Sequence, residues 1–237
     1  MQLDRRFRSI PEYPHLVSYE HAVEKIIQVL KPEVPSIQTE DALLEIETEV
    51  TRRMENLKSI APFRISHSAD MALARLSYIV CRALKPRIVV ETGVAYGVTT
   101  AYLLKAMDVN RSGTLHSIDL PPLGKQADAY VGYLIPEDLK SRWVLHRGSV
   151  SRVMPGLLRE LRQVDMFIHD SLHTYHTMFW EFSNVTPYLS AKSALIADDI
   201  GENDAFNQWS EKQQPSLVLI VRKLNSNLPI GFALHSH

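Results

Sequence analysis

The sequence predicts an α/β fold in which helices cover both faces of a mostly parallel β-sheet. Short apolar runs alternate with amphipathic helical segments after residue 86, and each run has the length of a buried strand. Such alternation is typical of a doubly wound sheet with right-handed crossovers. The last two runs, 216–222 and 229–235, have only a short Asn-containing segment between them, which predicts a terminal antiparallel pair.

Before the sheet, the chain has a helical pattern. Residues 19–31 place apolar side chains on one face, 39–58 begin with acidic residues, and 68–84 end before a proline. We interpret residues 1–65 as a helical extension and 66–237 as the sheet domain. Because the apolar faces of the extension need a partner, we expect it to cover the crevice as a lid or to form a homo-oligomer contact.

The predicted sheet contains five buried parallel strands before the terminal pair. These strands are at 88–92, 114–120, 143–148, 165–170 and 194–200. The helical segments between them are at 98–108, about 125–140, 150–162 and 173–189. Ligands of such sheets bind at the carboxyl ends of the strands, so candidate functional residues are sought there.

Composition narrows the class of protein. The chain has 237 residues, which is enough for one α/β domain with a modest extension. Its net charge is -1, so it lacks the excess of basic residues that would indicate a nucleic-acid partner. No apolar run approaches the roughly 18 residues of a membrane helix. The N-terminus has no signal-peptide pattern, and we expect a cytoplasmic location. The single cysteine, Cys81, cannot form an internal disulfide and is expected to be buried.

A glycine-containing loop follows the first strand of the sheet. The strand ends at Glu91 and Thr92, and the loop runs from Gly93 to Gly97 before a helix whose N-terminus offers unpaired N–H groups. Ala95 takes the place of the middle glycine of a dinucleotide fingerprint, which argues against a nicotinamide cofactor. We expect Glu91 to point into the crevice, where it suits a cationic amino-acid cofactor. The alternative is a plain strand–helix turn.

The next two strand ends also carry polar residues. The second strand ends at Asp119, where a carboxylate can accept hydrogen bonds from both hydroxyls of a ribose. Ser149 follows the third strand, beside the expected position of an adenine ring. With Glu91 and Gly93, these residues fall at three successive strand ends, which together indicate a nucleoside-containing cofactor.

Three segments carry a resemblance to a known family: VVETGVAYGVTTAYLL, LHSIDLP and FIHDSLHTYHTMFWEF. They resemble the class I S-adenosylmethionine-dependent methyltransferases, most closely the methyltransferase domain 24 group, some of which are labelled cephalosporin hydroxylase-like. The resemblance covers about residues 66–212 and implies a Rossmann-like fold that binds S-adenosyl-L-methionine. The candidate cofactor residues are Glu91, Thr92, Gly93, Gly97, Asp119, Ser149 and Asp170. Two departures are Ala95 in the loop and Ser190–Ser193 where many relatives have Pro-Gly-Gly.

Acidic residues follow the fourth and fifth strands. The fourth strand ends at Asp170 and the fifth at Asp198 and Asp199, and these ends are neighbours in a sheet ordered 3-2-1-4-5. Three converging carboxylates, with no nearby run of lysine or arginine to neutralise them, predict a divalent cation, most plausibly Mg²⁺. The alternative is that these acids cap the helices that follow.

The cluster is similar to that of two groups of metal-dependent O-methyltransferases, the catechol and caffeoyl-CoA type and the antibiotic-sugar type. This similarity implies a basic residue three positions after the first acid, which here is His173. We therefore expect His173 and Asp170 to be catalytic, with His173 as general base or, alternatively, as a substrate-binding residue. His176 is expected to flank the site, and His67 to close over the cofactor.

The function expected from these residues is methyl transfer to an oxygen of a small molecule, a sugar or secondary metabolite, assisted by a cation. Two alternatives stay open. One is a metal-dependent hydroxylase or hydrolase on the same fold, and the other is a non-catalytic module that binds the cofactor.

Overall fold

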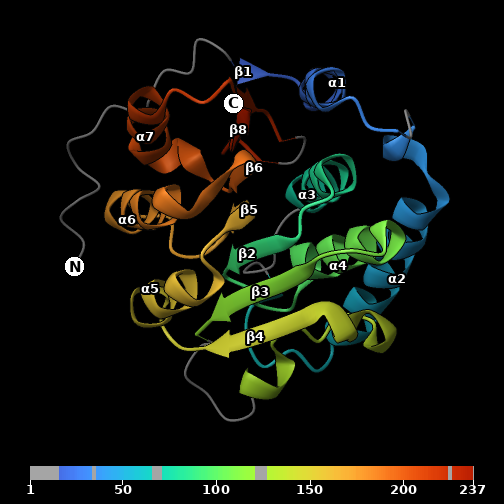
Figure 1. Ribbon diagram of the computed structural model, residues 1–237. Helices are drawn as coiled ribbons and strands as arrows, with labels where there is room; N and C mark the ends of the chain where they lie inside the picture. The colour runs from blue at the N-terminus through green and yellow to red at the C-terminus, as the bar shows by residue number, and fades with distance from the viewer. Residues whose placement is uncertain (1–15, 34–35, 66–70, 121–126, 224–225, 237) are drawn as a thin grey trace.

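The computed structural model describes residues 16–33, 36–65, 71–120, 127–223 and 226–236. Within them, one sheet contains eight strands in the order β1-β7-β8-β6-β5-β2-β3-β4 (Figure 1). The strands are β1 (Leu16–Val17), β2 (Ile88–Thr92), β3 (Thr114–Asp119), β4 (Trp143–Arg147), β5 (Val164–His169), β6 (Leu189–Ala197), β7 (Leu217–Val221) and β8 (Ile230–Ser236).

Strand β8 is antiparallel to both of its neighbours, β6 and β7, and the other pairs are parallel. The predicted order of the five central strands and the terminal antiparallel pair are confirmed. Because β8 is antiparallel to both β6 and β7, these two strands run parallel to each other. The carboxyl end of β7 therefore lies at the same edge of the sheet as those of β2 to β6, where ligands of such folds bind.

Seven α-helices and five short 3₁₀ helices occur in the described residues. The α-helices are α1 (Tyr19–Leu30), α2 (Asp41–Leu57), α3 (Met71–Leu84), α4 (Val98–Asn110), α5 (Val150–Leu161), α6 (Tyr175–Val185) and α7 (Ala205–Gln213). The 3₁₀ helices are η2 (Ile37–Thr39), η4 (Ala127–Tyr130), η5 (Glu137–Arg142), η6 (Thr186–Tyr188) and η7 (Ile200–Glu202). No α-helix in these ranges is long and apolar enough to cross a membrane.

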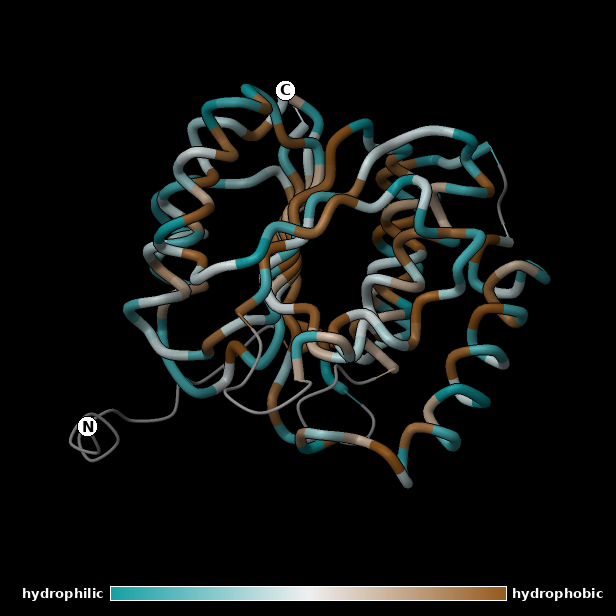
Figure 2. The backbone as a smooth tube through the Cα atoms, turned by 90° about the horizontal axis from the view of Figure 1, so that it is seen from below, coloured by the Kyte–Doolittle hydropathy of each residue, from teal (hydrophilic) through white to brown (hydrophobic). Residues whose placement is uncertain are grey.

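The helices form a layer on each face of the sheet. Helices α3 and α4 lie on one face and α5, α6 and α7 on the other (Figure 1). Adjacent residues of β2 face opposite layers, since Val89 belongs to one buried apolar cluster and Val90 to the other. Figure 2 shows the hydrophobic positions concentrated along the strands between the two layers. The apolar core therefore covers both faces of the sheet, and the edge of the sheet is where a functional site can lie.

The N-terminal helices add to one of these layers. Helix α1 packs against α3, and α2 packs against α4. The apolar residues Ala22 and Ile26 of α1 and Leu43 and Ile46 of α2 are buried in the same cluster as α3 and α4. The apolar faces that predicted a lid or an oligomer contact are thus covered within the chain itself.

Four local features differ from the predictions. In the described part of 125–140, two 3₁₀ helices replace the expected α-helix, because Gly132 has a φ of +73° and Pro136 precedes η5. Helix α7 and the short edge strand β1 were not expected. Helix α6 begins at Tyr175, capped by Thr174, so it starts two residues later than predicted.

Candidate functional site

A cavity of about 660 Å³ lies at the carboxyl ends of β2 to β5. Four residues predicted to bind the cofactor line it, namely Gly93, Asp119, Ser149 and Asp170. His176 also lines it, as expected. The rest of the wall includes two aromatic side chains, Phe63 and Trp180. One cavity therefore joins residues that follow four different strands.

The glycine loop is fixed by close packing. Gly93 has a φ of +85°, and a Cβ there would lie 2.0 Å from the backbone oxygen of Asp170, so only glycine fits. Gly97 has a φ of +88° and is the N-cap of α4, outside the described cavity wall. Ala95 has a φ of +47°, a left-handed conformation that costs a non-glycine residue about 1–2 kcal/mol. The sequence departure at Ala95 is therefore a strained position.

Asp119 holds this loop while it lines the cavity. Its Oδ2 accepts hydrogen bonds from the backbone N–H groups of Val94, at 2.7 Å, and Ala95, at 3.0 Å. Ser149 is the residue before α5, and it too lines the cavity. A carboxylate and a hydroxyl thus face the same space from neighbouring strand ends.

The expectation that Glu91 points into the crevice is wrong. Glu91 is fully buried, and its Oε2 accepts hydrogen bonds from Thr100 Oγ1 at 2.9 Å and Ser117 Oγ at 2.6 Å. Burial raises the pKa of Glu91 to about 7. Thr92 is also buried and donates to Glu181 Oε2 at 2.7 Å. Side chains at the end of a strand still alternate between the faces of the sheet, so Glu91 contacts α4 on one face and Thr92 contacts α6 on the other.

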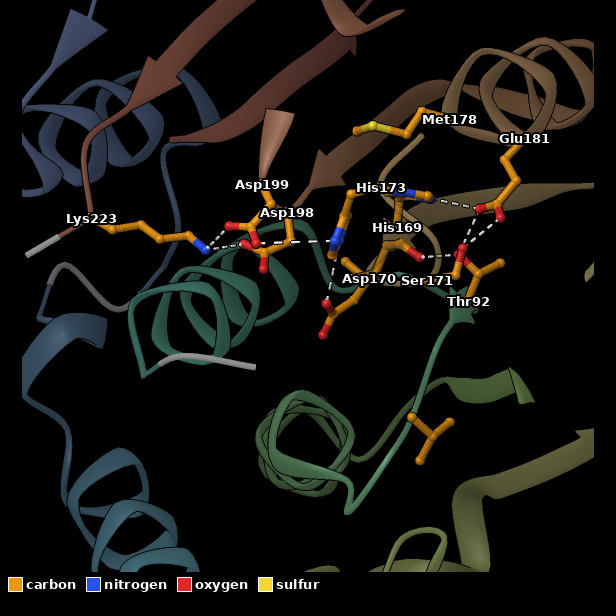
Figure 3. A network of polar contacts seen from close by, with 12 residues as sticks. Thr92, His169, Asp170, Ser171, His173, Met178, Glu181, Asp198, Asp199 and Lys223 are labelled. Carbon is orange, nitrogen blue, oxygen red and sulfur yellow. Dashed lines mark hydrogen bonds and ion pairs between the residues drawn. The ribbon is translucent and has the colours of Figure 1, made fainter. Parts of the chain in front are cut away.

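The predicted acid cluster does form, beside the cavity. One donor atom each of Asp170, His173 and Asp198 lies within 4.8 Å of the others. His173 Nε2 is 3.8 Å from Asp170 Oδ1, and His173 Nδ1 is 4.0 Å from Asp199 Oδ2 (Figure 3). Of these four residues, Asp170 is the one in the described cavity wall. Asp170 therefore links the cavity to the cluster.

The capping alternative is wrong for Asp170 and for Asp199. Helix α6 is capped by Thr174, whose Oγ1 accepts a hydrogen bond from Thr177 N at 3.3 Å, not by Asp170. Asp199 precedes η7 but makes no side-chain capping hydrogen bond.

Lys223 is the residue of this cluster that sequence reasoning missed. Its Nζ lies 2.6 Å from Asp198 Oδ1 and 2.7 Å from Asp199 Oδ1, and the residue is only 5% exposed. The expectation that no basic residue neutralises these acids is therefore wrong. The available signal was a lysine just after a buried strand, but its position depends on β7 running parallel to β6.

The donors do not fit the Mg²⁺ site expected from Asp170, Asp198 and Asp199. Mg²⁺ prefers an octahedral shell of oxygen ligands. Here one of the three converging donors is the imidazole of His173, and Asp199 is not among them. Asp198 and Asp199 also pair already with an ammonium group.

Charges within the cluster depend on burial. Burial and the neighbouring Asp198 carboxylate hold the pKa of Asp170 above its usual range. Burial, with His169 and Lys223 adding to it, lowers the pKa of His173 to about 4, although Asp199 and Glu181 oppose this. The His173 ring is therefore neutral near pH 7.

A second buried pair includes Glu181 of the cavity wall and was also missed. His169 Nδ1 lies 2.7 Å from Glu181 Oε2, and both side chains are inaccessible to solvent. Ser171 donates to Glu181 Oε1 at 2.7 Å, and Thr92 donates to the other oxygen (Figure 3). This network ties the loop after β5 to helix α6. His67, expected to close over the cofactor, is outside the described residues.

Comparisons with known proteins concern the same part of the chain. Residues 90–200 match the profile of a family described as a methyltransferase domain. No curated protein matches the chain significantly.

Solved structures share the fold at low sequence identity. The O-methyltransferase TomG from Streptomyces achromogenes, involved in tomaymycin synthesis and in complex with SAM, is 13% identical with a TM-score of 0.61 over 94% of this chain and 100% of that chain. A putative caffeoyl-CoA O-methyltransferase from Staphylococcus aureus is 13% identical, with a TM-score of 0.59 over 91% and 100%. An O-methyltransferase from Bacillus cereus, in complex with SAH, is 12% identical, with a TM-score of 0.56 over 90% and 96%.

These alignments cover more of the chain than residues 66–237, so the likeness extends into the N-terminal helices, which sequence reasoning had placed outside it. The chain therefore has the Rossmann-like α/β fold of these methyltransferase structures, and its residues 90–200 are similar to a methyltransferase domain.

Proposed function

We propose that the protein uses S-adenosyl-L-methionine to methylate an oxygen of a small molecule, such as a sugar or a secondary metabolite. The observation that carries the proposal is that Asp170 belongs both to the cavity with the glycine loop and to the cluster with His173. A cofactor held by the loop and an acceptor beside the cluster would then meet at Asp170. The comparisons support this proposal, since two of the structures named are O-methyltransferases in complex with SAM or SAH.

The cavity fits a cofactor of this kind. Its volume of about 660 Å³ is in the range of small-molecule sites. Gly93 allows close approach of the backbone, Asp119 would accept hydrogen bonds from ribose hydroxyls, and Phe63 and Trp180 offer apolar walls. When bound, the cofactor supplies a methyl group on a sulfonium for in-line transfer.

The residues at the far side of Asp170 would orient the acceptor and remove its proton. His173 is neutral and has a buried Nε2 with no hydrogen-bond partner in the described structure. We propose His173 as the base, with His176 as the other candidate because it lines the cavity. Both lie at the N-terminal end of α6, so they can be compared directly.

Residues 58–65 would complete the cofactor side. Phe63 stacks on Tyr96 of the glycine loop with ring centroids 3.9 Å apart, and its backbone oxygen accepts from the Tyr96 hydroxyl at 2.5 Å. We propose that this end of the helical extension covers the cofactor. Self-association through the N-terminal helices and a cytoplasmic location stay predictions.

A metal-dependent hydroxylase or hydrolase is less well supported, because Lys223 already pairs with two of the acids that would hold its metal. A non-catalytic module would bind the cofactor but show no transfer to any acceptor.

Calorimetry with S-adenosylhomocysteine tests the cofactor assignment. We expect Asp119→Ala to weaken binding by about 1.5–3 kcal/mol, since a charged acceptor is lost. Asp138→Ala, which removes an exposed acid of η5, is the matched control and should bind like the parent protein. An unchanged affinity of Asp119→Ala would contradict the assignment, and a parent protein that binds no S-adenosylhomocysteine would contradict the proposed function.

Turnover with a responsive acceptor tests the base. We expect His173→Gln to lower kcat by roughly 10²–10⁴-fold with little change in acceptor KM. His176→Gln should mainly raise KM. The reverse pattern would assign the base to His176 and leave His173 as a binding residue.

A further inference from the structure

A buried ammonium group lies where the sequence predicted a metal ion. Lys223 follows β7, and its Nζ contacts one carboxylate oxygen of Asp198 and one of Asp199 (Figure 3). The side chains of Lys223 and Asp198 are only 3% and 6% exposed. This pairing is not a surface salt bridge, because solvent reaches neither partner to an appreciable extent.

The burial of these charges explains why they occur together. A buried ammonium or carboxylate without a partner is strongly destabilising, whereas a paired one can be retained. One lysine placed between two carboxylates lowers the repulsion between them, and Asp170 lies close enough to gain from the same positive charge, which opposes the rise in its pKa. The cluster is therefore held together by a cation that belongs to the chain.

The same ammonium opposes the entry of a divalent ion. An ion shared by Asp170, His173 and Asp198 would bind the Asp198 carboxylate, which Lys223 already contacts. The ion and the Lys223 ammonium, both positive, would then lie close enough to repel each other strongly. Removing the ammonium would leave the three donors in place and the acids uncompensated. Such a site offers two carboxylates, which suit Mn²⁺, together with one imidazole.

We propose that Lys223 serves as the resident cation of the acid cluster and blocks a latent divalent-cation site formed by Asp170, His173 and Asp198. The cluster then needs no metal ion in the parent protein. This goes beyond the proposed function, because it concerns how the cluster is neutralised and not what is methylated.

Titration with Mn²⁺, followed by electron paramagnetic resonance of the free ion, tests the proposal directly. We expect the parent protein to show no binding below millimolar Mn²⁺. Lys223→Met should bind at least about tenfold more tightly, since the competing charge is gone. Adding Asp198→Asn to this variant should abolish the gain. Lys192→Met, which removes an exposed lysine of β6, should behave like the parent protein.

Thermal unfolding gives a second readout. Mn²⁺ should raise the Tm of Lys223→Met and leave that of the parent protein unchanged. Circular dichroism checks the fold, and Lys223→Gln replaces Lys223→Met in both measurements if the latter does not fold. Binding of Mn²⁺ by the parent protein as tightly as by the variants would overturn the proposal, and so would the absence of any gain in the variants. Neither readout uses the methyl-transfer cofactor, so a failure here is distinct from a failure of the proposed function.

Discussion

The two halves of the sheet edge compensate their carboxylates in different ways. At the ends of β2 to β4, Asp119 is held by two backbone N–H groups of the loop that it lies beside. At the ends of β5 to β7, Asp198 and Asp199 are held by the side chain of Lys223, from a different strand. A carboxylate stabilised by a loop depends on local backbone geometry, whereas one stabilised by a distant ammonium depends on the whole sheet.

The difference has consequences for substitution. Backbone donors cannot be removed by changing a side chain, so substitutions at Val94 or Ala95 should leave the hydrogen bonds to Asp119 in place, whereas a substitution of Asp119 removes them. In the other half either partner can be removed, and the one left behind stays buried with an unbalanced charge.

The largest effect is expected from breaking the buried ion pair. Asp198→Asn should lower the free energy of unfolding by about 3–5 kcal/mol, because it leaves a buried ammonium with one partner fewer. Asp199→Asn is the matched comparison, and with its side chain 26% exposed it should cost only about 1 kcal/mol. Urea unfolding of both variants measures this. Equal costs would show that the pairing with Asp198 is no stronger than that of a surface pair.

A pH-dependent effect is expected from Glu91, which has hydroxyl partners instead of a charged one. Its pKa is about 7 in the folded protein against an ordinary 4.5. Below pH 4.5 the carboxyl is protonated in both states and costs nothing. Between pH 4.5 and pH 7 the unfolded chain releases this proton while the folded protein retains it, so the group lowers stability by up to about 3 kcal/mol, and above pH 7 the loss stays constant.

Glu91→Gln should remove that dependence. The stability of the variant relative to the parent protein should therefore rise between pH 4.5 and pH 7 and level off above pH 7, as followed by unfolding free energies across this range. A difference that stays constant with pH would mean that Glu91 does not titrate there.

The smallest effect is expected at Ala95. Glycine would relieve the strain of its positive φ, by about 1–2 kcal/mol, but would also add freedom to the unfolded chain, by about 0.5–1 kcal/mol. Ala95→Gly should thus raise the free energy of unfolding by about 0.5 kcal/mol, read from the urea midpoint. A loss of stability would show that the Cβ of Ala95 makes contacts that outweigh the strain.

The site could be predicted from the sequence only in part. Gly93, Asp119, Ser149 and Asp170 follow consecutive strands, and all four line the cavity, because parallel strands bring their ends to one edge. The orientation of Glu91 could not be predicted, because it depends on which face of the sheet the last strand residue meets. Phe63 was missed because nothing in its segment has a periodic pattern.

The periodicity of apolar residues by itself determined the central strands, most of the helices that cover them and the edge at which the polar residues gather. Only the tertiary structure decided how the charges at that edge are balanced. Lys223 is 24 residues beyond Asp199. It reaches Asp199 because β7 runs parallel to β6, since both strands are antiparallel to β8. Pairing of this kind leaves no local pattern, because electrostatic interactions depend on distance in space and not along the chain.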